Sequence, residues 1–232
     1  MPIVVTQYSN AILEDISFRL EAGKHLIILG ANGVGKTTLA KLLCGLIPAS
    51  EITIQGMHPS SVYGSKRAKA INYIPPKLEV FDAFITVRDY LSLGALDGSL
   101  SIDEAMERLG IQHLSDQFCI SLSSGEAQLL MIASALLHHA SYTIFDEPTA
   151  NLDPQKMQTL FGILKAEQDL QSKIIITHNL DFAYQLGFDI LYLAEKRIQF
   201  QGTSSDFFST ENLDRLYAGS VEKRADNIVV KL

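Results

Sequence analysis

The chain has 232 residues, of which 47% are hydrophobic and 19% charged, and this composition excludes a disordered or collagen-like protein. Its formal net charge of −7 is opposite in sign to that of a general nucleic-acid binder, so we expect no nucleic-acid partner. The longest apolar runs, residues 129–133 and 190–194, have five residues each, whereas a membrane-spanning helix needs about 20.

The beginning of the sequence and its cysteines both favour a cytosolic protein. Residues 1–7 contain no basic region, no long apolar stretch and no cleavage site, so we expect no signal peptide. Cys44 and Cys119 are far apart and do not form a C-x-x-C pair, which argues against a disulfide framework or a zinc site. Each is expected to be a small core residue.

The sequence predicts two kinds of β-strand. Residues 3–5, 16–20 and 52–54 are short strands linked by turn-like segments, which predicts a small antiparallel layer. Continuous apolar runs predict strands that are buried on both faces and joined by helices, as in a parallel sheet. These runs are residues 26–29, 143–145, 174–177 and 190–193.

Helix signals replace strand signals between about residues 77 and 140. Thr86 with Asp89, and Ser101 with Glu104, have the spacing of helix-capping pairs. From about Thr203 we expect a polar turn, a short helix near residues 213–217 and a strand over residues 227–231. The sequence therefore predicts one α/β domain over residues 1–232. Its core covers about 1–76 and 141–232 and includes an antiparallel β subdomain, and an α-helical subdomain is inserted at about 77–140.

The strongest motif lies between the strand at 26–29 and the helix expected from Thr38. Residues 30–37 match G-x-x-x-x-G-K-[ST], the phosphate-binding loop of P-loop NTPases. Its backbone N–H groups and the helix N-terminus would bind phosphate, Lys36 would reach the β and γ phosphates, and the Thr37 hydroxyl would bind Mg2+. The candidate nucleotide-binding residues are Gly30, Ala31, Asn32, Gly33, Val34, Gly35, Lys36, Thr37 and Thr38.

Two acidic residues follow the predicted strand at 143–145. Ligands of open α/β sheets bind outside the carboxyl ends of the strands, where Asp146 and Glu147 would lie. Asp146 is the second candidate Mg2+ ligand, and Glu147 is the candidate base that polarises the attacking water. Alternatively, the two acids simply end a strand.

A third motif, L-S-S-G-E at residues 122–126, resembles the signature of a known family. It resembles the L-S-G-G-Q signature of the ATPase subunits of ATP-binding cassette (ABC) transporters, and Ser123 lies 23 residues before Asp146, as in that family. The segment is also a helix start that Ser123 and Glu126 can cap. The resemblance implies that the signature residues contact the ATP of a second subunit, in a head-to-tail homodimer or a pseudo-dimer with another ABC ATPase. These residues are Ser123, Ser124, Gly125 and Glu126.

Further matches extend the resemblance over nearly the whole chain. Asp153 occupies the D-loop position, which implies a contact with the partner subunit. His178, directly after a buried strand, resembles the catalytic switch histidine near the γ-phosphate. Tyr8, 22 residues before Gly30, matches the aromatic residue that stacks on adenine, although it could also be an ordinary surface tyrosine.

The sequence departs from the family at a few positions. Pro76 stands where the Q-loop glutamine is expected, and proline has neither a side-chain oxygen nor an N–H donor. Ser124 replaces a glycine and Glu126 a glutamine, and the acidic side chain adds repulsion toward phosphate. These departures predict slow hydrolysis or altered coupling to a transmembrane partner.

The resemblance implies a peripheral ATPase subunit on the cytoplasmic face of the plasma membrane. It would bind ATP and Mg2+ and drive transmembrane permease subunits, and it is similar to importers of ferric siderophores, haem, cobalamin or a similar metal chelate. Two alternatives stay open: a soluble ABC ATPase without a transport role, and a subunit that binds nucleotide but hydrolyses it weakly.

Overall fold

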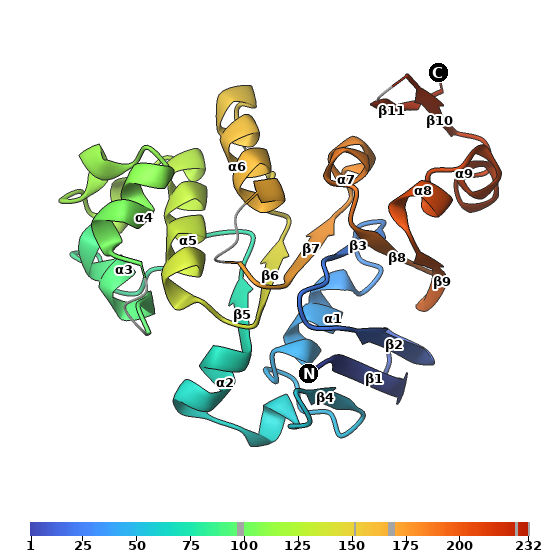
Figure 1. Cartoon of the computed structure of the whole chain (residues 1–232), viewed down its shortest axis with the longest axis horizontal. Helices are drawn as coiled ribbons and strands as arrows, with labels where there is room; N and C mark the ends of the chain where they lie inside the picture. Colours follow the sequence, from blue (N-terminus) through green and yellow to red (C-terminus); the bar gives the residue numbers. More distant parts are fainter. Residues whose placement is uncertain (97–99, 151, 167–169, 226, 232) are drawn as a thin grey trace. The chain divides into compact units, whose positions relative to one another are not determined.

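The chain forms two compact units in a computed structural model that describes residues 1–96, 100–150, 152–166, 170–225 and 227–231 (Figure 1). Unit 1 comprises Met1–Ser61 and Ile174–Leu232, and unit 2 comprises Val62–Lys173.

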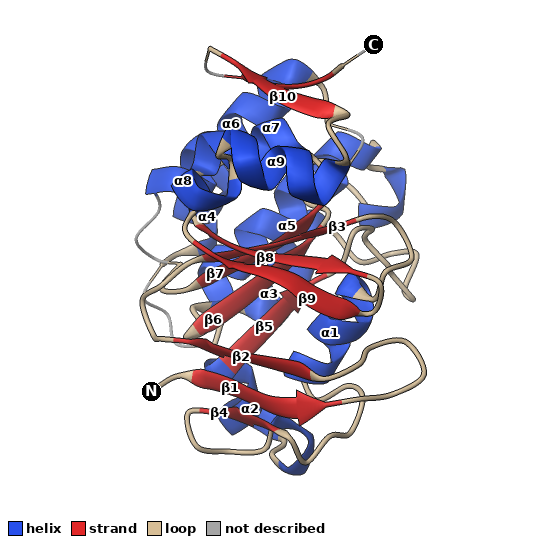
Figure 2. Ribbon diagram, turned by 90° about the vertical axis from the view of Figure 1, so that its right-hand side faces the viewer, coloured by secondary structure: helices blue, strands red, loops and turns tan. Residues whose placement is uncertain are grey.

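Unit 1 begins with the predicted antiparallel layer, which consists of β1 (Ile3–Tyr8), β2 (Ile16–Leu20) and β4 (Ile52–Ile54) in the order β2-β1-β4 (Figure 2). Alternate residues of β2 are buried, as expected for a layer with one face in the core. The pairing of β1 with β2 shifts between Val5 and Tyr8, where Gln7 has a φ of 51°. This irregularity leaves Tyr8 buried.

The larger sheet of unit 1 is formed around β3 (Leu26–Gly30), which pairs in parallel with β7 (Lys173–Thr177) and with β8 (Asp189–Ala194). Every residue of β3 and β7 is buried, which explains their continuous apolar sequences and confirms the predicted strands. The strand β9 (Arg197–Gly202) pairs antiparallel with β8 and was not predicted. It is only half-buried and polar at several positions, so its sequence has no continuous apolar run.

The other elements of unit 1 lie around this sheet. The helix after β3 begins at Lys36, two residues earlier than predicted. Thr203, expected in a turn, caps a short helix. The helices are α1 (Lys36–Leu43), η1 (Pro59–Ser61), α7 (Leu180–Leu186), α8 (Ser204–Phe207) and α9 (Thr210–Tyr217), and the last strands are β10 (Val221–Arg224) and β11 (Asn227–Val230).

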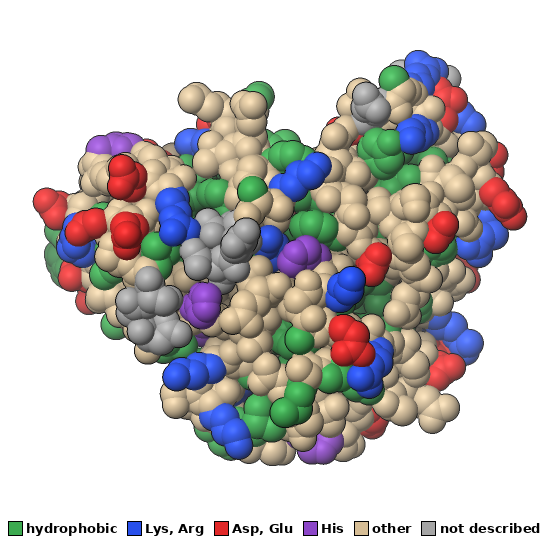
Figure 3. Space-filling view, viewed as in Figure 1, with side chains coloured by type: hydrophobic (Ala, Val, Ile, Leu, Met, Phe, Trp, Pro, Cys, Tyr) green, Lys and Arg blue, Asp and Glu red, His purple; other side chains and the backbone are tan. Residues whose placement is uncertain are grey.

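A C-terminal hairpin of β10 and β11 lies against α7 (Figure 1). The Ile228 N–H donates to Asp181 Oδ1 at 2.9 Å, which ties β11 to the first turn of α7. Figure 3 shows basic and acidic side chains beside each other at this hairpin, where Arg224 pairs with Glu222 and Lys231 Nζ lies 3.8 Å from Asp214 Oδ1. These charged pairs lie at the surface, where they contribute little, so backbone pairing and the Ile228 hydrogen bond hold the hairpin.

Unit 2 contains the predicted helical region. Thr86 and Ser101 both form complete capping boxes, with Asp89 and Glu104, which confirms these helix starts. The helices are α2 (Gly64–Ala70), α3 (Val87–Gly94), α4 (Ile102–Arg108), η2 (Gln112–Leu114), η3 (Cys119–Ser121), α5 (Ser124–His138) and α6 (Pro154–Ala166). Two parallel strands, β5 (Ile71–Ile74) and β6 (Tyr142–Asp146), complete the unit.

Two further expectations concern the core and the membrane. Cys44 and Cys119 are both free and buried, which confirms them as core residues, and burial raises the pKa of the Cys119 thiol. Within the described part of the chain, no helix has the length and hydropathy that crossing a bilayer requires.

Candidate nucleotide-binding site

The phosphate loop, residues 30–37, joins β3 to α1 in unit 1, and its shape depends on glycine. Gly30, Gly33 and Gly35 have φ angles of +156°, +80° and +110°, which other residues rarely adopt. A Cβ on Gly30 would lie 2.5 Å from the Leu193 carbonyl oxygen, and one on Gly35 would lie 2.7 Å from Leu13 Cδ2. Gly30 and Gly35 are therefore favoured by backbone conformation and by close contacts together, whereas Gly33, with nothing within 4 Å, is favoured by its backbone conformation alone.

Lys36 is bound inside this loop. Its side chain is buried, and Nζ donates hydrogen bonds to the carbonyl oxygens of Gly30 at 2.8 Å and Ala31 at 3.0 Å. The first turn of α1 contains no acidic residue, so its positive dipole end is not offset there. A cation and a helix N-terminus at the end of a parallel strand together favour an anion.

The other predicted loop residues differ in exposure. Ala31, Asn32, Gly33 and Thr37 are exposed, whereas Val34 and Thr38 are half-buried. The Thr37 side chain, which carries a hydroxyl oxygen of the kind that Mg2+ prefers, is thus accessible to solvent.

His178 also lies in unit 1, at the same edge of the sheet. Thr177 is paired with Leu29 in the parallel ladder, so His178 and Gly30 both follow the carboxyl ends of neighbouring strands. His178 is exposed, and Asn179 after it caps α7. This placement agrees with a histidine that faces a ligand of the loop.

Tyr8, the predicted adenine-stacking residue, is only 7% exposed. Its hydroxyl accepts a hydrogen bond from Asn10 Nδ2 at 3.1 Å. The ring lies in the wall of a cavity of about 470 Å3 in unit 1. The other lining residues are Pro48, Ala49, Ser50, Glu51, His58, Ser60 and Ser61.

The acidic pair lies at the end of β6 in unit 2. Asp146 is 1% exposed, and the Tyr73 hydroxyl donates to its Oδ2 atom at 2.9 Å. Glu147 has a φ of 49°, an uncommon conformation for a residue with a side chain. Other non-glycine residues of the chain, such as Gln7 and Asp15, share this conformation, so the role of Glu147 as the base stays a prediction.

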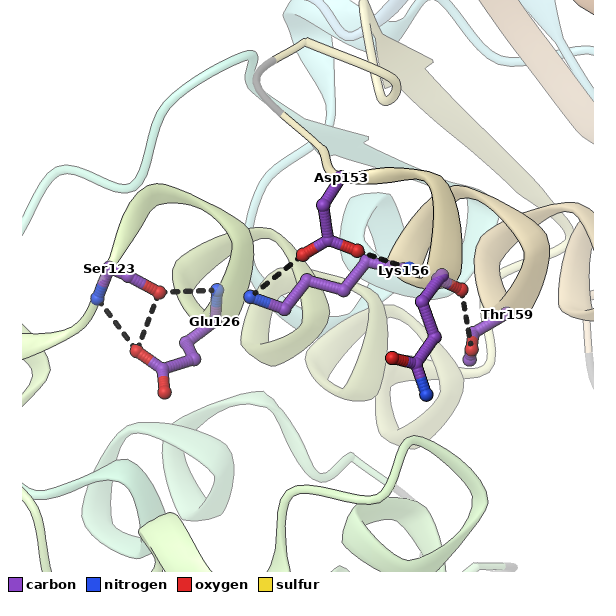
Figure 4. A network of polar contacts seen from close by, with 6 residues as sticks. Ser123, Glu126, Asp153, Lys156 and Thr159 are labelled. Atoms are coloured by element: carbon purple, nitrogen blue, oxygen red, sulfur yellow. Dashed lines mark hydrogen bonds and ion pairs between the residues drawn. The ribbon is translucent and has the colours of Figure 1, made fainter.

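The signature segment, residues 122–126, forms the start of the 15-residue helix α5 (Figure 4). Glu126 N donates to Ser123 Oγ at 3.3 Å, while Ser123 N and Ser123 Oγ donate to Glu126 Oε2 at 2.8 and 2.6 Å. This geometry confirms the predicted capping box. The Ser123 hydrogen bonds, helped by the charge of Lys156, hold the pKa of Glu126 below its ordinary value.

Asp153 and Lys156, at the start of α6, complete the network in Figure 4. The Lys156 N–H donates to Asp153 Oδ1 at 2.9 Å and lowers the pKa of that carboxyl, and Lys156 Nζ lies 3.5 Å from Asp153 Oδ2. A Cβ on Gly125 would lie 2.7 Å from Lys156 Nζ, so the ammonium group covers this glycine. Lys156 could not be predicted as part of this network, because nothing in the local sequence links it to Gly125.

Unit 2 also contains a cavity of about 420 Å3 that the sequence did not predict. Gln128 in its wall is 2% exposed, and its Nε2 atom has no hydrogen-bond partner. The sequence signal for this cavity is the polar amide of Gln128 among the apolar residues of α5. The lining residues are Pro76, Lys77, Leu78, Val80, Cys119, Ile120, Leu122, Ser124, Ala127, Gln128, Met131 and Ala150.

The predicted site residues are divided between the two units. Unit 1 holds the phosphate loop, Tyr8 and His178, and unit 2 holds Asp146, Glu147, the signature segment and Asp153. In the described residues, no group of three or more His, Cys, Asp or Glu side chains could hold a metal ion. A metal held by few protein ligands and by phosphate, as is usual for Mg2+, would be consistent with this finding.

Comparisons with known proteins agree with the motifs. The family model described as "ABC transporter" matches residues 13–150, and one described as "AAA domain, putative AbiEii toxin, Type IV TA system" matches residues 120–182. The zinc import ATP-binding protein ZnuC of Alcanivorax borkumensis is 32% identical over 184 residues, which cover 77% of this chain and 67% of the relative.

Two more similar proteins come from other bacteria. The energy-coupling factor transporter ATP-binding protein EcfA1 of Thermotoga maritima is 30% identical over 207 residues, 86% of this chain and 79% of the relative. The structure of cbiO1 from Clostridium perfringens, part of the ABC transporter complex cbiONQ, has a TM-score of 0.74 at 27% identity and covers 92% of this chain and 93% of its own. The predicted P-loop NTPase fold is thereby confirmed.

Proposed function

The chain belongs to the ABC transporter family and is one of its ATPases, and we propose that it hydrolyses ATP to power the import of a metal ion or metal chelate. The observation that carries this proposal is the phosphate loop, in which three glycines have positive φ angles and the buried Lys36 donates to the carbonyl oxygens of Gly30 and Ala31. A loop of this geometry at the end of a parallel strand is an anion site.

The phosphate-binding roles are assigned to unit 1. Backbone N–H groups of the loop bind the phosphates, and Lys36 neutralises the β and γ phosphate oxygens after it leaves the carbonyls of Gly30 and Ala31. His178 contacts the γ-phosphate, which its exposed position after β7 supports. Tyr8 provides the stacking surface for adenine.

The hydrolytic roles are assigned to Asp146 and Glu147. The Thr37 hydroxyl of unit 1 and the Asp146 carboxylate of unit 2 each offer an oxygen ligand of the kind that Mg2+ prefers, and Mg2+ would neutralise charge on the phosphates. Glu147 accepts a proton from the water that attacks the γ-phosphorus, as the bond to the β-phosphate oxygen breaks. Pro76 cannot assist through a side-chain oxygen, so we expect hydrolysis to be slow.

A second subunit is part of the proposal. Ser123, Ser124 and Gly125 at the N-terminus of α5 bind the γ-phosphate of the ATP held by the partner, in a head-to-tail dimer of like or related chains. The ammonium group of Lys156 beside Gly125 supports this role because it offsets the negative charge of Glu126. Asp153 contacts the partner subunit.

A transmembrane permease is the remaining partner, and unit 2 offers a surface for it. Ile120 lines the cavity and is 68% exposed, while Phe84 and Phe118 lie edge to face with ring centres 6.1 Å apart and are 78% and 45% exposed. Exposed apolar side chains beside a cavity are typical of a protein interface. This contact would place the chain at the cytoplasmic face of the membrane.

The nature of the cargo is supported by relatives alone. ZnuC is named for zinc import, which favours an imported metal over an exported compound. Ferric siderophores, haem and cobalamin remain specific candidates within this class. The cargo itself would be recognised by the permease.

Glu147→Gln tests the catalytic assignment. The full chain is expected to hydrolyse ATP, and the variant to bind ATP normally but to lose hydrolysis by about 100-fold or more. Glu107→Gln, an exposed position on α4, is the matched control and should keep the wild-type rate. Equal inactivity of the wild type and Glu147→Gln, with ATP still bound, would instead establish the weakly hydrolysing alternative.

Gentle solubilisation of membranes that contain the tagged chain tests the transport assignment. A stoichiometric partner with several membrane-spanning helices is expected, and metal uptake should fail when Glu147→Gln replaces the wild type. Recovery from the soluble fraction alone, with no such partner, would contradict the proposal and favour a soluble ABC ATPase.

A further inference from the structure

Tyr73 and Asp146 are joined across the two strands of unit 2. Tyr73 lies opposite Ile144 in the parallel ladder of β5 and β6, so its side chain reaches forward along β6 to the carboxylate two residues later. The hydroxyl donates to Asp146 Oδ2 at 2.9 Å. Tyr73 is half-buried and Asp146 is 1% exposed, so water competes little for this hydrogen bond.

A hydrogen bond from a hydroxyl to a carboxylate is stronger than one between neutral groups. It restricts rotation of the Asp146 carboxyl group, because Oδ2 must remain near the Tyr73 hydroxyl. The orientation of the Oδ1 atom is then restricted as well. Pro76, three residues after Tyr73 on the same chain segment, has no side-chain donor or acceptor with which to help.

We propose that Tyr73 is a positioning residue that orients Asp146 toward Mg2+, and this inference rests on the proposed function. Tyr73 contacts neither nucleotide nor metal in this role. Groups that hydrogen-bond to a metal ligand fix its orientation and tune its affinity for the metal, and their loss typically costs 10–100-fold in metal affinity or activity.

Tyr73→Phe removes one oxygen atom and keeps the ring, so it isolates the hydrogen bond. ATP binding to the full chain is measured by calorimetry in EDTA and over a Mg2+ titration. In EDTA the variant should bind ATP as the wild type does. The Mg2+ concentration that gives half of the metal-dependent gain in affinity should rise about tenfold. An unchanged thermal unfolding midpoint would show that the fold is intact.

Tyr63→Phe is the matched control, because Tyr63 is 73% exposed in the same unit and does not contact Asp146. It should leave the Mg2+ titration unchanged. In an Asp146→Asn background, Tyr73→Phe should have no further effect on the titration, since both changes act on the same ligand.

Three results would overturn the inference: a wild-type Mg2+ titration for Tyr73→Phe, an equal loss of affinity in EDTA, or an undiminished effect in the Asp146→Asn background. Failure of the proposed function looks different. In that case the wild-type chain itself would bind no ATP, or Mg2+ would not alter its affinity for ATP.

Discussion

The phosphate loop of unit 1 and the signature segment of unit 2 both place a helix N-terminus where we propose that phosphate binds, but they are held in different ways. In the phosphate loop, Gly30 and Gly35 both have positive φ angles that favour glycine. An added Cβ would meet the Leu193 carbonyl oxygen at the first position and the Leu13 side chain at the second. In the signature segment, the Ser123 and Glu126 side chains cap α5. The loop matches its motif in full, whereas the signature segment departs from it at two of five residues.

This difference shows which of the two motifs tolerates amino-acid substitution. A loop that is fixed by positive φ angles and close contacts is disrupted when a Cβ is added at a position where both apply, as at Gly30 and Gly35. A helix start that is fixed by a side-chain cap keeps its shape as long as the two capping residues are retained. Glu126 replaces the glutamine of the family signature and still completes the capping box, because either side chain can accept from the Ser123 N–H.

Gly35→Ala should have the largest effect. The new Cβ would lie 2.7 Å from Leu13 Cδ2 at a φ of +110°, so we expect a loss of about 2–4 kcal/mol in unfolding free energy and loss of ATP binding. Urea unfolding and calorimetry measure these two quantities. Gly33→Ala, where nothing lies within 4 Å, adds only backbone strain of about 1–2 kcal/mol. Equal effects of the two variants would contradict the role of close contacts.

Lys36→Met should weaken ATP binding without destroying the fold. Loss of a charged donor to phosphate costs about 1.5–3 kcal/mol per hydrogen bond, so we expect at least about a 100-fold lower affinity for ATP. Calorimetry at constant Mg2+ measures this change. Lys41→Met, an exposed lysine of the same helix, should keep the wild-type affinity. A wild-type affinity of Lys36→Met for ATP would contradict the proposed contact of Lys36 with the phosphates.

Ser123→Ala tests the side-chain cap of the signature segment. Loss of the cap should lower the unfolding free energy by about 1 kcal/mol, which shifts the unfolding midpoint of a chain of this size by roughly 2–4 °C. Ser65→Ala, at an exposed position, should change the free energy by less than about 0.5 kcal/mol. If Ser123→Ala and Ser65→Ala have the same unfolding midpoint, the capping box does not stabilise α5.

Glu126→Gln should have the smallest effect and a specific pH dependence. The pKa of Glu126 lies below its ordinary value of 4.5 in the folded chain, so its charged form stabilises the fold above that value. The stabilisation is lost as the pH falls through the lowered pKa. The wild type should be more stable than the variant by less than about 1 kcal/mol at pH 7 and should lose this advantage in acid. Unfolding of the wild type and the variant, measured at pH 7 and at acidic pH, gives the difference in unfolding free energy between them. A difference that grows in acid would contradict this prediction.

Much of the fold could be predicted because burial on both faces produces continuous apolar runs, as in β3 and β7. The antiparallel layer and the capping boxes of α3 and α4 could also be predicted, because short stretches of the sequence determine them. β5 and β9 were not predicted. Their polar residues lie at half-buried positions, so no run of apolar residues distinguishes them from loops.

The candidate site could be predicted where chemistry depends on residues close in sequence. The phosphate loop and the pair of Ser123 and Glu126 are of this kind. The hydrogen bond from Tyr73 to Asp146 joins residues 73 positions apart, and the contact of Lys156 with Gly125 joins two separate helices. Such contacts depend on strand register and helix packing, which one sequence does not reveal.

The Ser123 hydroxyl has a single proton, and in the capping box it uses that proton to donate a hydrogen bond to the Glu126 carboxylate. A phosphate oxygen that accepts from Ser123 must therefore displace this carboxylate. The competitor is tethered three residues away, so its local concentration is on the order of millimolar or higher and does not fall when the protein is diluted. The affinity of the signature segment for phosphate would then be limited by an internal competitor.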